Sequence, residues 1–254
     1  MVDRSVITIL VKRIKALKSF VPNDEVNSVF SDLVKLALTS RDKIHISRED
    51  FDYIQKSAAL AEYELEKDSV LQILDNKKKL EEFIYYNNYI KLTRIEWNSL
   101  LSCRLHKNHK VLFVGSGPLP LTGLILARDY GCHVTLMDIS GEAIDLSKKL
   151  VLKLELSDNV DIVNSDALSF DKYLNFDVIY LAALAGISKG LKKKILDKIK
   201  SDSSEKVHLI ARSSFGNREI LYKPLTDDDI EGFKIDLEVK PHNDVVNSFL
   251  ILSK

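Results

Sequence analysis

The chain has 254 residues, 45% of them hydrophobic, which is enough to bury one large domain or one domain with a smaller helical lobe. Lysine plus arginine and aspartate plus glutamate both total 37, so no basic excess indicates a nucleic-acid partner. No segment is typical of a membrane span or a signal peptide. The two cysteines are too far from each other in the sequence, and too few, to indicate a disulfide framework or a metal site. We therefore expect a cytoplasmic protein without nucleic-acid or membrane partners.

The first part of the chain is predicted to be all helical. Apolar residues recur at helical spacing in three long segments, 24–40, 49–74 and 79–103, and glycine is missing from residues 1 to about 105. We expect these helices to form an N-terminal lobe over residues 1–107 that caps the functional site.

From Lys110 onward, strand-like runs alternate with helical ones. The strand-like runs are 110–116, 133–139, 160–166, 176–184 and 207–213. This alternation predicts an α/β domain over residues 108–254, with a parallel sheet covered by helices on both faces. The last two runs, 232–240 and 245–254, are joined by "PHND" without a helix, which predicts an antiparallel pair that closes the sheet.

Two charged stretches in this half are predicted to be structural. The lysines of "KGLKKKILDKIK" (189–200) have the spacing of a solvated face on an amphipathic helix. The acidic sequence "TDDD" (226–229) is typical of a helix N-terminus. Neither stretch is assigned a function.

The first strand leads into "GSGPLPLTG" (115–123), a glycine turn followed by a helix. A turn that binds a pyrophosphate offers backbone N–H groups at the start of the helix, and proline has no N–H to donate. Pro118 and Pro120 therefore argue against a dinucleotide. Gly115 and Gly117 instead permit close approach of the backbone to a ligand without phosphate.

A doubly wound sheet that ends in an antiparallel pair resembles the Rossmann-like class I S-adenosylmethionine-dependent transferase fold. S-adenosylmethionine carries a sulfonium cation and no phosphate, which fits a turn that contains prolines. The resemblance implies that the cofactor lies across the carboxyl ends of the first strands. The turn residues expected to contact it are Gly115, Ser116, Gly117 and Pro118.

Two aspartates follow the second and third strands, where this fold places cofactor ligands. Asp138 is expected to hold the ribose hydroxyls, and Asp166 is expected to close over the adenine. Each aspartate could instead be a helix N-cap, a position that its short acceptor side chain favours. The order of strand, turn, acid, strand and acid favours the cofactor interpretation over the capping one.

Long motifs then resemble one family. The sequences "GSGPLPLTG", "YYNNYIKLTRIEWNSLLS", "FDVIYLAALAGISK" and "ARSSFGNREILYKP" together resemble nicotianamine synthases, and the similarity runs from about Glu64 to the C-terminus. The first 60 residues resemble the family only in being helical. The resemblance implies transfer of the 3-amino-3-carboxypropyl group of S-adenosylmethionine to an amine, with release of methylthioadenosine and formation of a nicotianamine-like metal chelator, a metallophore.

The acceptor amine must lose a proton before it can attack, so a base is expected in the helical lobe. The sequence "AEYELEKD" places Glu62 and Glu66 on one helix face and Glu64 on another. The glutamate that acts as base in the family aligns best with Glu64, and a gap before Phe83 leaves Glu66 as the alternative. Without the resemblance, a solvated helix surface is the expected role of Glu64.

Three tyrosines are the other candidates in the lobe. Tyr89 matches a family tyrosine of the active site, and its hydroxyl is expected to orient the acceptor or to relay its proton. Tyr85 and Tyr86 are expected to bind substrate, with core packing as the alternative for such an aromatic stripe.

On the sheet side, Ala183 and Leu184 in "LAALAG" are expected to present backbone to the methionyl end of the cofactor. Arg212, at the end of the fifth strand, is expected to bind a substrate carboxylate, with a surface salt bridge as the alternative. Arg218 is a weaker candidate. No metal site is expected in the catalyst.

Two other functions compete with aminocarboxypropyl transfer. The chain could be a methyltransferase with a helical cap, which would release S-adenosylhomocysteine, or a cofactor-binding protein without turnover. The sequence leaves open the acceptor, the number of transfers and the oligomeric state.

Overall fold

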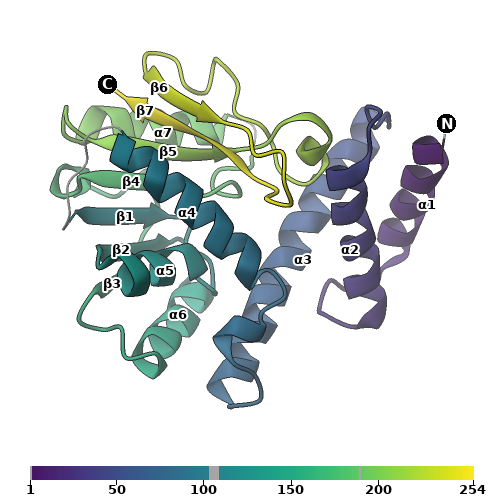
Figure 1. Ribbon diagram of the computed structural model, residues 1–254, viewed down its shortest axis with the longest axis horizontal. Helices are drawn as coiled ribbons and strands as arrows, with labels where there is room; N and C mark the ends of the chain where they lie inside the picture. Colours follow the sequence, from purple (N-terminus) through teal and green to yellow (C-terminus); the bar gives the residue numbers. More distant parts are fainter. Residues whose placement is uncertain (1, 103–108, 189) are drawn as a thin grey trace.

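The computed structural model of the chain describes residues 2–102, 109–188 and 190–254. In Figure 1 a sheet with its covering helices occupies one side of the molecule, and α1 (Val2–Ala16) and α2 (Asp24–Thr39) lie at the opposite side. The long helix α3 (Arg48–Leu74) lies between these two parts. It can therefore cover a ligand that binds at the side of the sheet facing α1 and α2.

The described strands form one seven-stranded sheet in the order β3-β2-β1-β4-β5-β7-β6. The bounds are β1 Lys110–Val114, β2 His133–Asp138, β3 Val160–Asn164, β4 Val178–Leu181, β5 His208–Ser213, β6 Lys234–Val239 and β7 Ser248–Ser253. The strands β1 to β5 pair in parallel, and β7 pairs antiparallel with both β5 and β6. The predicted parallel sheet with an antiparallel closing pair is confirmed.

Helices cover both faces of this sheet. Val111 and Phe113 of β1 pack into the core on the side of α4, α5 and α6, whereas Leu112 and Val114 pack into the core on the side of α7. Successive strand residues point to opposite faces, so a strand buried on both sides needs an unbroken apolar run. The bounds are α4 Tyr86–Ser102, α5 Leu121–Tyr130, α6 Gly141–Lys153 and α7 Leu191–Asp202.

The N-terminal segment is helical, as predicted. Its helices are α1 Val2–Ala16, α2 Asp24–Thr39 and α3 Arg48–Leu74. The side chain of Asn23 caps α2 by accepting the N–H groups of Glu25 and Val26, and the hydroxyl of Ser47 caps α3 by accepting the N–H of Asp50. Short 3₁₀ segments complete the chain, η1 Leu80–Glu82, η2 Tyr173–Asn175 and η3 Gly216–Ile220.

The hydrophobic core is continuous between the helices and the sheet. Val70 and Ile73 of α3 and Leu92 and Trp97 of α4 belong to the same buried cluster as β1 and α5. A separate cluster joins α1, α2 and the first half of α3 to Leu221 and other residues near η3. The predicted domain boundary at 107/108 falls outside the described residues and stays a prediction.

Two expectations about local structure are wrong. Residues 79–103 do not form one helix, because Leu80 and Phe83 turn inward to the core and the described helix α4 begins only at Tyr86. The "TDDD" stretch does not begin a helix. Instead Asp229 accepts hydrogen bonds from the N–H and the hydroxyl of Thr226, which closes a local turn.

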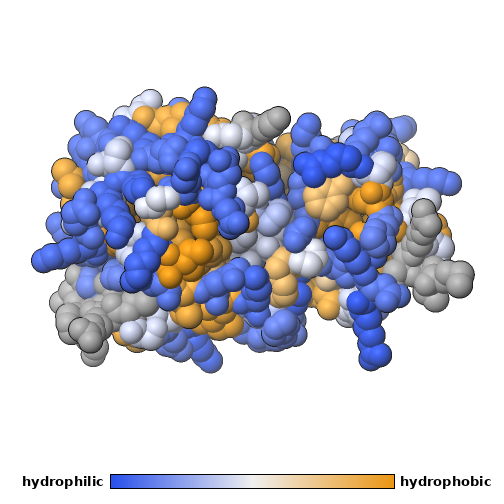
Figure 2. All heavy atoms as spheres, turned by 90° about the horizontal axis from the view of Figure 1, so that it is seen from above, coloured by the Kyte–Doolittle hydropathy of each residue, from blue (hydrophilic) through white to orange (hydrophobic). Residues whose placement is uncertain are grey.

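The surface seen in Figure 2 is mostly hydrophilic, with hydrophobic side chains gathered in separate patches. Across the described residues, every helix is too short or too polar to cross a lipid bilayer.

Candidate active site

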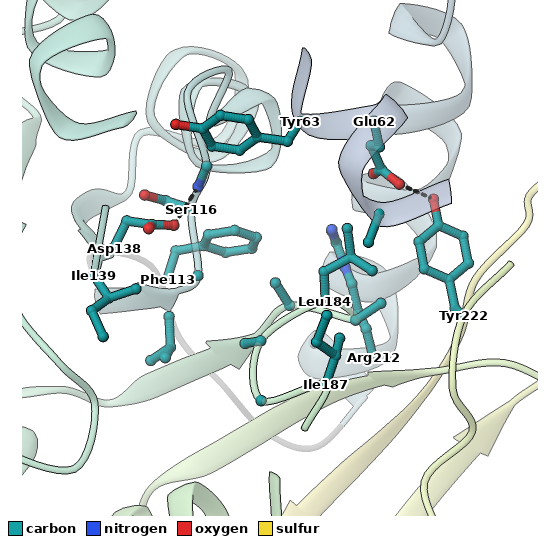
Figure 3. Close-up of a pocket in the computed structure, with 18 of the residues that line it drawn as sticks. Glu62, Tyr63, Phe113, Ser116, Asp138, Ile139, Leu184, Ile187, Arg212 and Tyr222 are labelled. Atoms are coloured by element: carbon teal, nitrogen blue, oxygen red, sulfur yellow. Dashed lines mark hydrogen bonds between the residues drawn. The ribbon is translucent and has the colours of Figure 1, made fainter. Parts of the chain in front are cut away.

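A cavity of about 660 Å³ lies where β1, β2, β4 and β5 end and α3 passes over them. In Figure 3, Ser116 and Asp138 lie on one side of this cavity, and Glu62 and Tyr222 lie on the other. The predicted site residues that line it are Tyr89, Gly115, Ser116, Gly117, Asp138, Asp166, Ala183, Leu184 and Arg212. The sheet end and the helical segment therefore share one site.

The glycine turn requires both of its glycines. Gly115 and Gly117 have φ angles of 78° and 67°, in the left-handed region that favours glycine. A Cβ atom on Gly115 would lie 2.9 Å from Cβ of Ala185, and one on Gly117 would lie 2.8 Å from Oε2 of Glu66. The turn thus lies directly against the loop after β4 on one side and against α3 on the other.

The N–H groups of the turn already have acceptors inside the protein. Gly115 and Ser116 both donate to the carbonyl of Met137, and Gly117 donates to Oδ2 of Asp138. These N–H groups are not arranged as a phosphate cradle, in agreement with the argument from the prolines. Pro118 is the one turn residue of the predicted set that does not line the cavity.

Ser116 lines the cavity, and its hydroxyl is unpaired in the part of the chain that the structure describes. Its Oγ is buried and has no hydrogen-bond partner among the described residues. A buried hydroxyl without a partner is costly, and a ligand in the cavity could satisfy it.

Asp138 lies at the end of β2 with its carboxylate at the cavity wall. Oδ1 accepts the N–H of Ser140 at 2.9 Å and Oδ2 accepts that of Gly117 at 2.8 Å. Each carboxylate oxygen keeps a second lone pair for a ligand hydroxyl. Asp138 is not the N-cap of α6, since Ser140 has that role.

Asp166 also lines the cavity, beyond the end of β3. Its carboxylate accepts the N–H of Leu168 at 3.0 Å, which closes a turn and caps no described helix. The helix-capping alternatives for both aspartates are therefore excluded.

The carboxylates of α3 that face the cavity are Glu62 and Glu66, which lie one helical turn apart. Glu64 is not among the lining residues, because it points from another face of the helix. The expectation that Glu64 is the base is corrected on this ground, and the choice moves to its two neighbours.

Each of the two carboxylates has a tyrosine partner. The hydroxyl of Tyr222 donates to Oε2 of Glu62 at 2.7 Å, the dashed bond in Figure 3, and that of Tyr89 donates to Oε1 of Glu66 at 3.3 Å. Burial and the adjacent carboxylates raise the pKa of both phenols well above the usual value, so both remain neutral donors.

The pKa values of the two carboxyls are raised to different degrees. Burial raises the pKa of Glu66 well above its usual value, and the negative charge of Glu62 raises it further. Burial also raises the pKa of Glu62, but the hydrogen bond from Tyr222 and the charge of Arg212 act in the opposite direction. Both carboxyls therefore ionise less readily than a free glutamate, and burial beside Glu62 raises the pKa of Glu66 more than the surroundings of Glu62 raise its own pKa.

Tyr85 and Tyr86 lie outside this cavity. The hydroxyl of Tyr86 accepts a hydrogen bond from Arg128, away from the site. Tyr85 precedes α4 and lines a smaller neighbouring cavity of about 230 Å³. The two cavities share Glu62, Tyr89, Tyr222 and Asn247, so only Tyr85 of the pair is near the site.

Arg212 lines the cavity but is already paired. Its Nε and Nη2 bond both carboxylate oxygens of Glu96 at 2.8 and 2.9 Å, and Nη2 also bonds the hydroxyl of Thr122 at 2.7 Å. Arg212 is 5% exposed and Glu96 is 0% exposed. The alternative of a surface salt bridge is thus wrong, because the pair is buried and joins β5 to α4. Nη1 takes no part in these bonds.

Arg218 lies away from the cavity. Its guanidinium donates to the carbonyl of Asn243 and lies over the ring of Phe215, with Cζ 4.6 Å from the ring centre. In the described parts of the chain, no group of three or more histidine, cysteine, aspartate or glutamate residues is arranged to hold a metal ion.

Among the cavity-lining residues that sequence reasoning missed, three have polar side chains that bear on the site. Tyr222 is part of the motif "ARSSFGNREILYKP". Its hydrogen bond with Glu62 could not be predicted because 160 positions separate the two residues in the sequence. Tyr63 donates a 3.0 Å hydrogen bond to Glu142 and lies 3.1 Å from the hydroxyl of Ser140, which ties α3 to α6 beside Asp138. Asn247 directly precedes β7, and no sequence pattern indicated that it lines the cavity.

The chain matches known proteins over nearly its whole length. A family model described as "Nicotianamine synthase protein" matches residues 3–254. The chain belongs to the nicotianamine synthase family. The chain is 31% identical over 260 residues to nicotianamine synthase 2 of Arabidopsis thaliana, covering 96% of this chain and 81% of the relative. It is 32% identical over 259 residues to nicotianamine synthase of Solanum lycopersicum, with the same coverage of both chains.

Solved structures of one nicotianamine synthase, MtNAS, match nearly the whole chain at 26% identity. A glutamate-to-glutamine variant of MtNAS in complex with S-adenosylmethionine has a TM-score of 0.84 and covers 98% of this chain and 97% of its own. MtNAS in complex with MTA and tNA has a TM-score of 0.85, with 98% and 96% covered. A protein assigned as an S-adenosylmethionine-dependent methyltransferase, from Methanococcus maripaludis, matches 75% of this chain at 15% identity with a TM-score of 0.54, which shows a shared fold.

Proposed function

We infer that this protein transfers the 3-amino-3-carboxypropyl group of S-adenosylmethionine to an amine, releases methylthioadenosine and forms nicotianamine. The match of nearly the whole chain to nicotianamine synthases carries this inference. Within the chain it is supported by a carboxylate pair that faces the same cavity as the glycine turn.

The residues present fit S-adenosylmethionine. The closely packed glycine turn leaves no phosphate cradle, and S-adenosylmethionine has no phosphate. We propose that Asp138 binds the ribose hydroxyls, that Asp166 lies at the adenine, and that Ser116 uses its free hydroxyl on the ligand. The strand order β2-β1-β4 then directs the methionyl chain toward Leu184.

We propose that Glu62 is the base. The pKa of its carboxyl is raised less than that of Glu66, and pairs of titratable groups with separated pKa values commonly divide the acid and base roles. Glu62 takes a proton from the acceptor ammonium. The freed lone pair attacks Cγ of the methionyl chain, the C–S bond breaks, and its electron pair goes to the sulfonium, which leaves as the thioether of methylthioadenosine.

Glu66 and Tyr89 are proposed to orient the acceptor rather than to take its proton. The 3.3 Å bond between them orients the Tyr89 hydroxyl beside the cavity, and the raised pKa of Glu66 favours the neutral form of that carboxyl. A neutral partner leaves one negative charge in the pair, which attracts the acceptor ammonium without the repulsion of two adjacent anions.

All three carbons bonded to the sulfonium are activated, so the reaction is selected by position. A nucleophile held in line at Cγ gives methylthioadenosine, whereas one held at the methyl carbon gives S-adenosylhomocysteine. Glu62 and Tyr222 come from the side of the cavity opposite Asp138, as Figure 3 shows. An amine bound there faces the methionyl end of the ligand.

Mass spectrometry of the purified protein with S-adenosylmethionine and added amino acids tests the proposal. We expect methylthioadenosine and an acceptor that has gained an aminocarboxypropyl group. S-adenosylhomocysteine as the product would show a methyltransferase instead. Cofactor binding without any product would show a binding protein.

A further inference from the structure

Lys192 differs from the other described lysines of its run. The sequence predicts a solvated lysine face on α7, and Lys194 is exposed as expected. Lys192, in the first turn of the helix, is only 2% exposed. The expectation of solvated lysines is therefore wrong at this one position, because the side chain turns under the loop that follows β4.

The ammonium of Lys192 donates a 2.6 Å hydrogen bond to the carbonyl of Ala183. No carboxylate of the described residues forms an ion pair with it, although the charge of Asp229 acts on it favourably and that of Lys223 unfavourably. Burial lowers the pKa of Lys192 to about 8. Burying an ammonium whose hydrogen-bond partner is a single carbonyl costs free energy of folding. We therefore expect Lys192 to have a role beyond packing.

The bonded carbonyl fixes the direction of the next N–H group. In a planar trans peptide the C=O of one residue and the N–H of the next point in opposite directions. The carbonyl of Ala183 points to Lys192, below the loop, so the N–H of Leu184 points away from Lys192. That N–H has no acceptor among the described residues, and Leu184 lines the cavity.

Two close contacts hold the loop in this orientation. A Cβ atom on Gly186 would lie 2.9 Å from the backbone nitrogen of Lys192, so the loop is packed directly on the first turn of α7. At its other side, Ala185 packs against Gly115 of the glycine turn. The loop thus connects Lys192 with the glycine turn at the cavity wall.

We propose that Lys192 is a positioning residue, which turns the 183–184 peptide so that the N–H of Leu184 donates to the carboxylate of S-adenosylmethionine. This inference rests on the proposed function, which gives the orientation of S-adenosylmethionine in the cavity. In that orientation the ribose lies at Asp138 and the methionyl end lies at Leu184. Methylthioadenosine lacks the aminocarboxypropyl group, so Lys192 contributes nothing to its binding.

Calorimetric titration of Lys192→Met with S-adenosylmethionine and with methylthioadenosine tests the proposal. We expect the Kd for S-adenosylmethionine to rise roughly tenfold or more, as for loss of a hydrogen bond to a charged group, and the Kd for methylthioadenosine to stay unchanged. Lys194→Met, at an exposed lysine of the same helix, is the matched control and should change neither value.

Equal weakening of both ligands would show a general structural role and overturn the proposal, as would no change in either. If Lys192→Met does not fold, Lys192→Gln supplies an uncharged side chain that is one bond shorter, so it holds the carbonyl less well than the ammonium does and should still weaken S-adenosylmethionine binding selectively. If neither variant folds, the role of Lys192 is purely structural and the proposal is wrong. Binding is measured without turnover, so a wild-type protein that binds but makes no product would refute the proposed function alone.

Discussion

The hydroxyl of Tyr222 donates to the carboxylate of Glu62 at 2.7 Å, although 160 positions separate the two residues in the sequence. Tyr222 follows η3 near the end of β5, and Glu62 lies in the middle of α3. This bond brings the helical segment to the carboxyl end of the sheet and stabilises the charged form of the proposed base.

Replacing Tyr222 by phenylalanine should shift the pH dependence of the reaction. Without the phenol donor, the anion of Glu62 loses a stabilising hydrogen bond, and its pKa rises further. The acid limb of the profile of kcat/KM against pH should therefore move to higher pH. Tyr86→Phe removes a hydroxyl that contacts Arg128 outside the cavity and should leave the profile unchanged. A profile that stays in place in Tyr222→Phe would contradict this assignment.

Glu66→Gln should stabilise the protein most at neutral and higher pH. The folded pKa of Glu66 is raised above 4.5, so the folded state holds a proton that the unfolded state releases. The wild-type protein thus loses stability as pH rises through that raised pKa, whereas glutamine has no proton to lose. The Tm difference between variant and wild type should increase from pH 4.5 upward. A difference that does not change with pH would show that Glu66 titrates normally.

Asp138→Ala should weaken binding of S-adenosylmethionine. The variant loses charge-assisted hydrogen bonds to the ribose, each worth about 1.5–3 kcal/mol, so the Kd should rise roughly tenfold or more. Asp166→Ala should have a smaller effect, because the adenine also makes stacking contacts. Asp161→Ala removes an exposed carboxylate of β3 and serves as the control in calorimetric titration. Unchanged affinity in folded Asp138→Ala would exclude Asp138 from the ribose site.

Glu96→Ala should destabilise the fold. The variant leaves the guanidinium of Arg212 buried without its carboxylate, which typically costs about 3–5 kcal/mol. Asp244→Ala breaks the exposed pair with Lys91 and should cost about 1 kcal/mol or less. Urea unfolding gives both free energies. Similar small losses in the two variants would show that the buried pair contributes no more than a surface pair.

The sequence predicted the sheet, its antiparallel closing pair and the glycine turn after β1, because these features depend on local patterns of strand alternation, glycine and proline. It did not predict which glutamate of α3 faces the cavity. Glu62, Glu64 and Glu66 differ only in their rotation about the helix axis, and that rotation is set by packing against the sheet. The interior position of Lys192 was missed for the same reason, since a lysine run has the same composition whether or not one member turns inward.

The central claim is that Glu62 removes the proton from the acceptor amine. The most direct measurement is the rate of methylthioadenosine formation by Glu62→Gln and Glu64→Gln, with the Kd for S-adenosylmethionine measured beside it. Glutamine keeps the size of glutamate but has no basicity, so Glu62→Gln should lose roughly 10²-fold or more in rate at unchanged cofactor affinity. Glu64→Gln, on another face of α3, should retain the wild-type rate. A Glu62→Gln variant that forms methylthioadenosine at the wild-type rate would contradict the account.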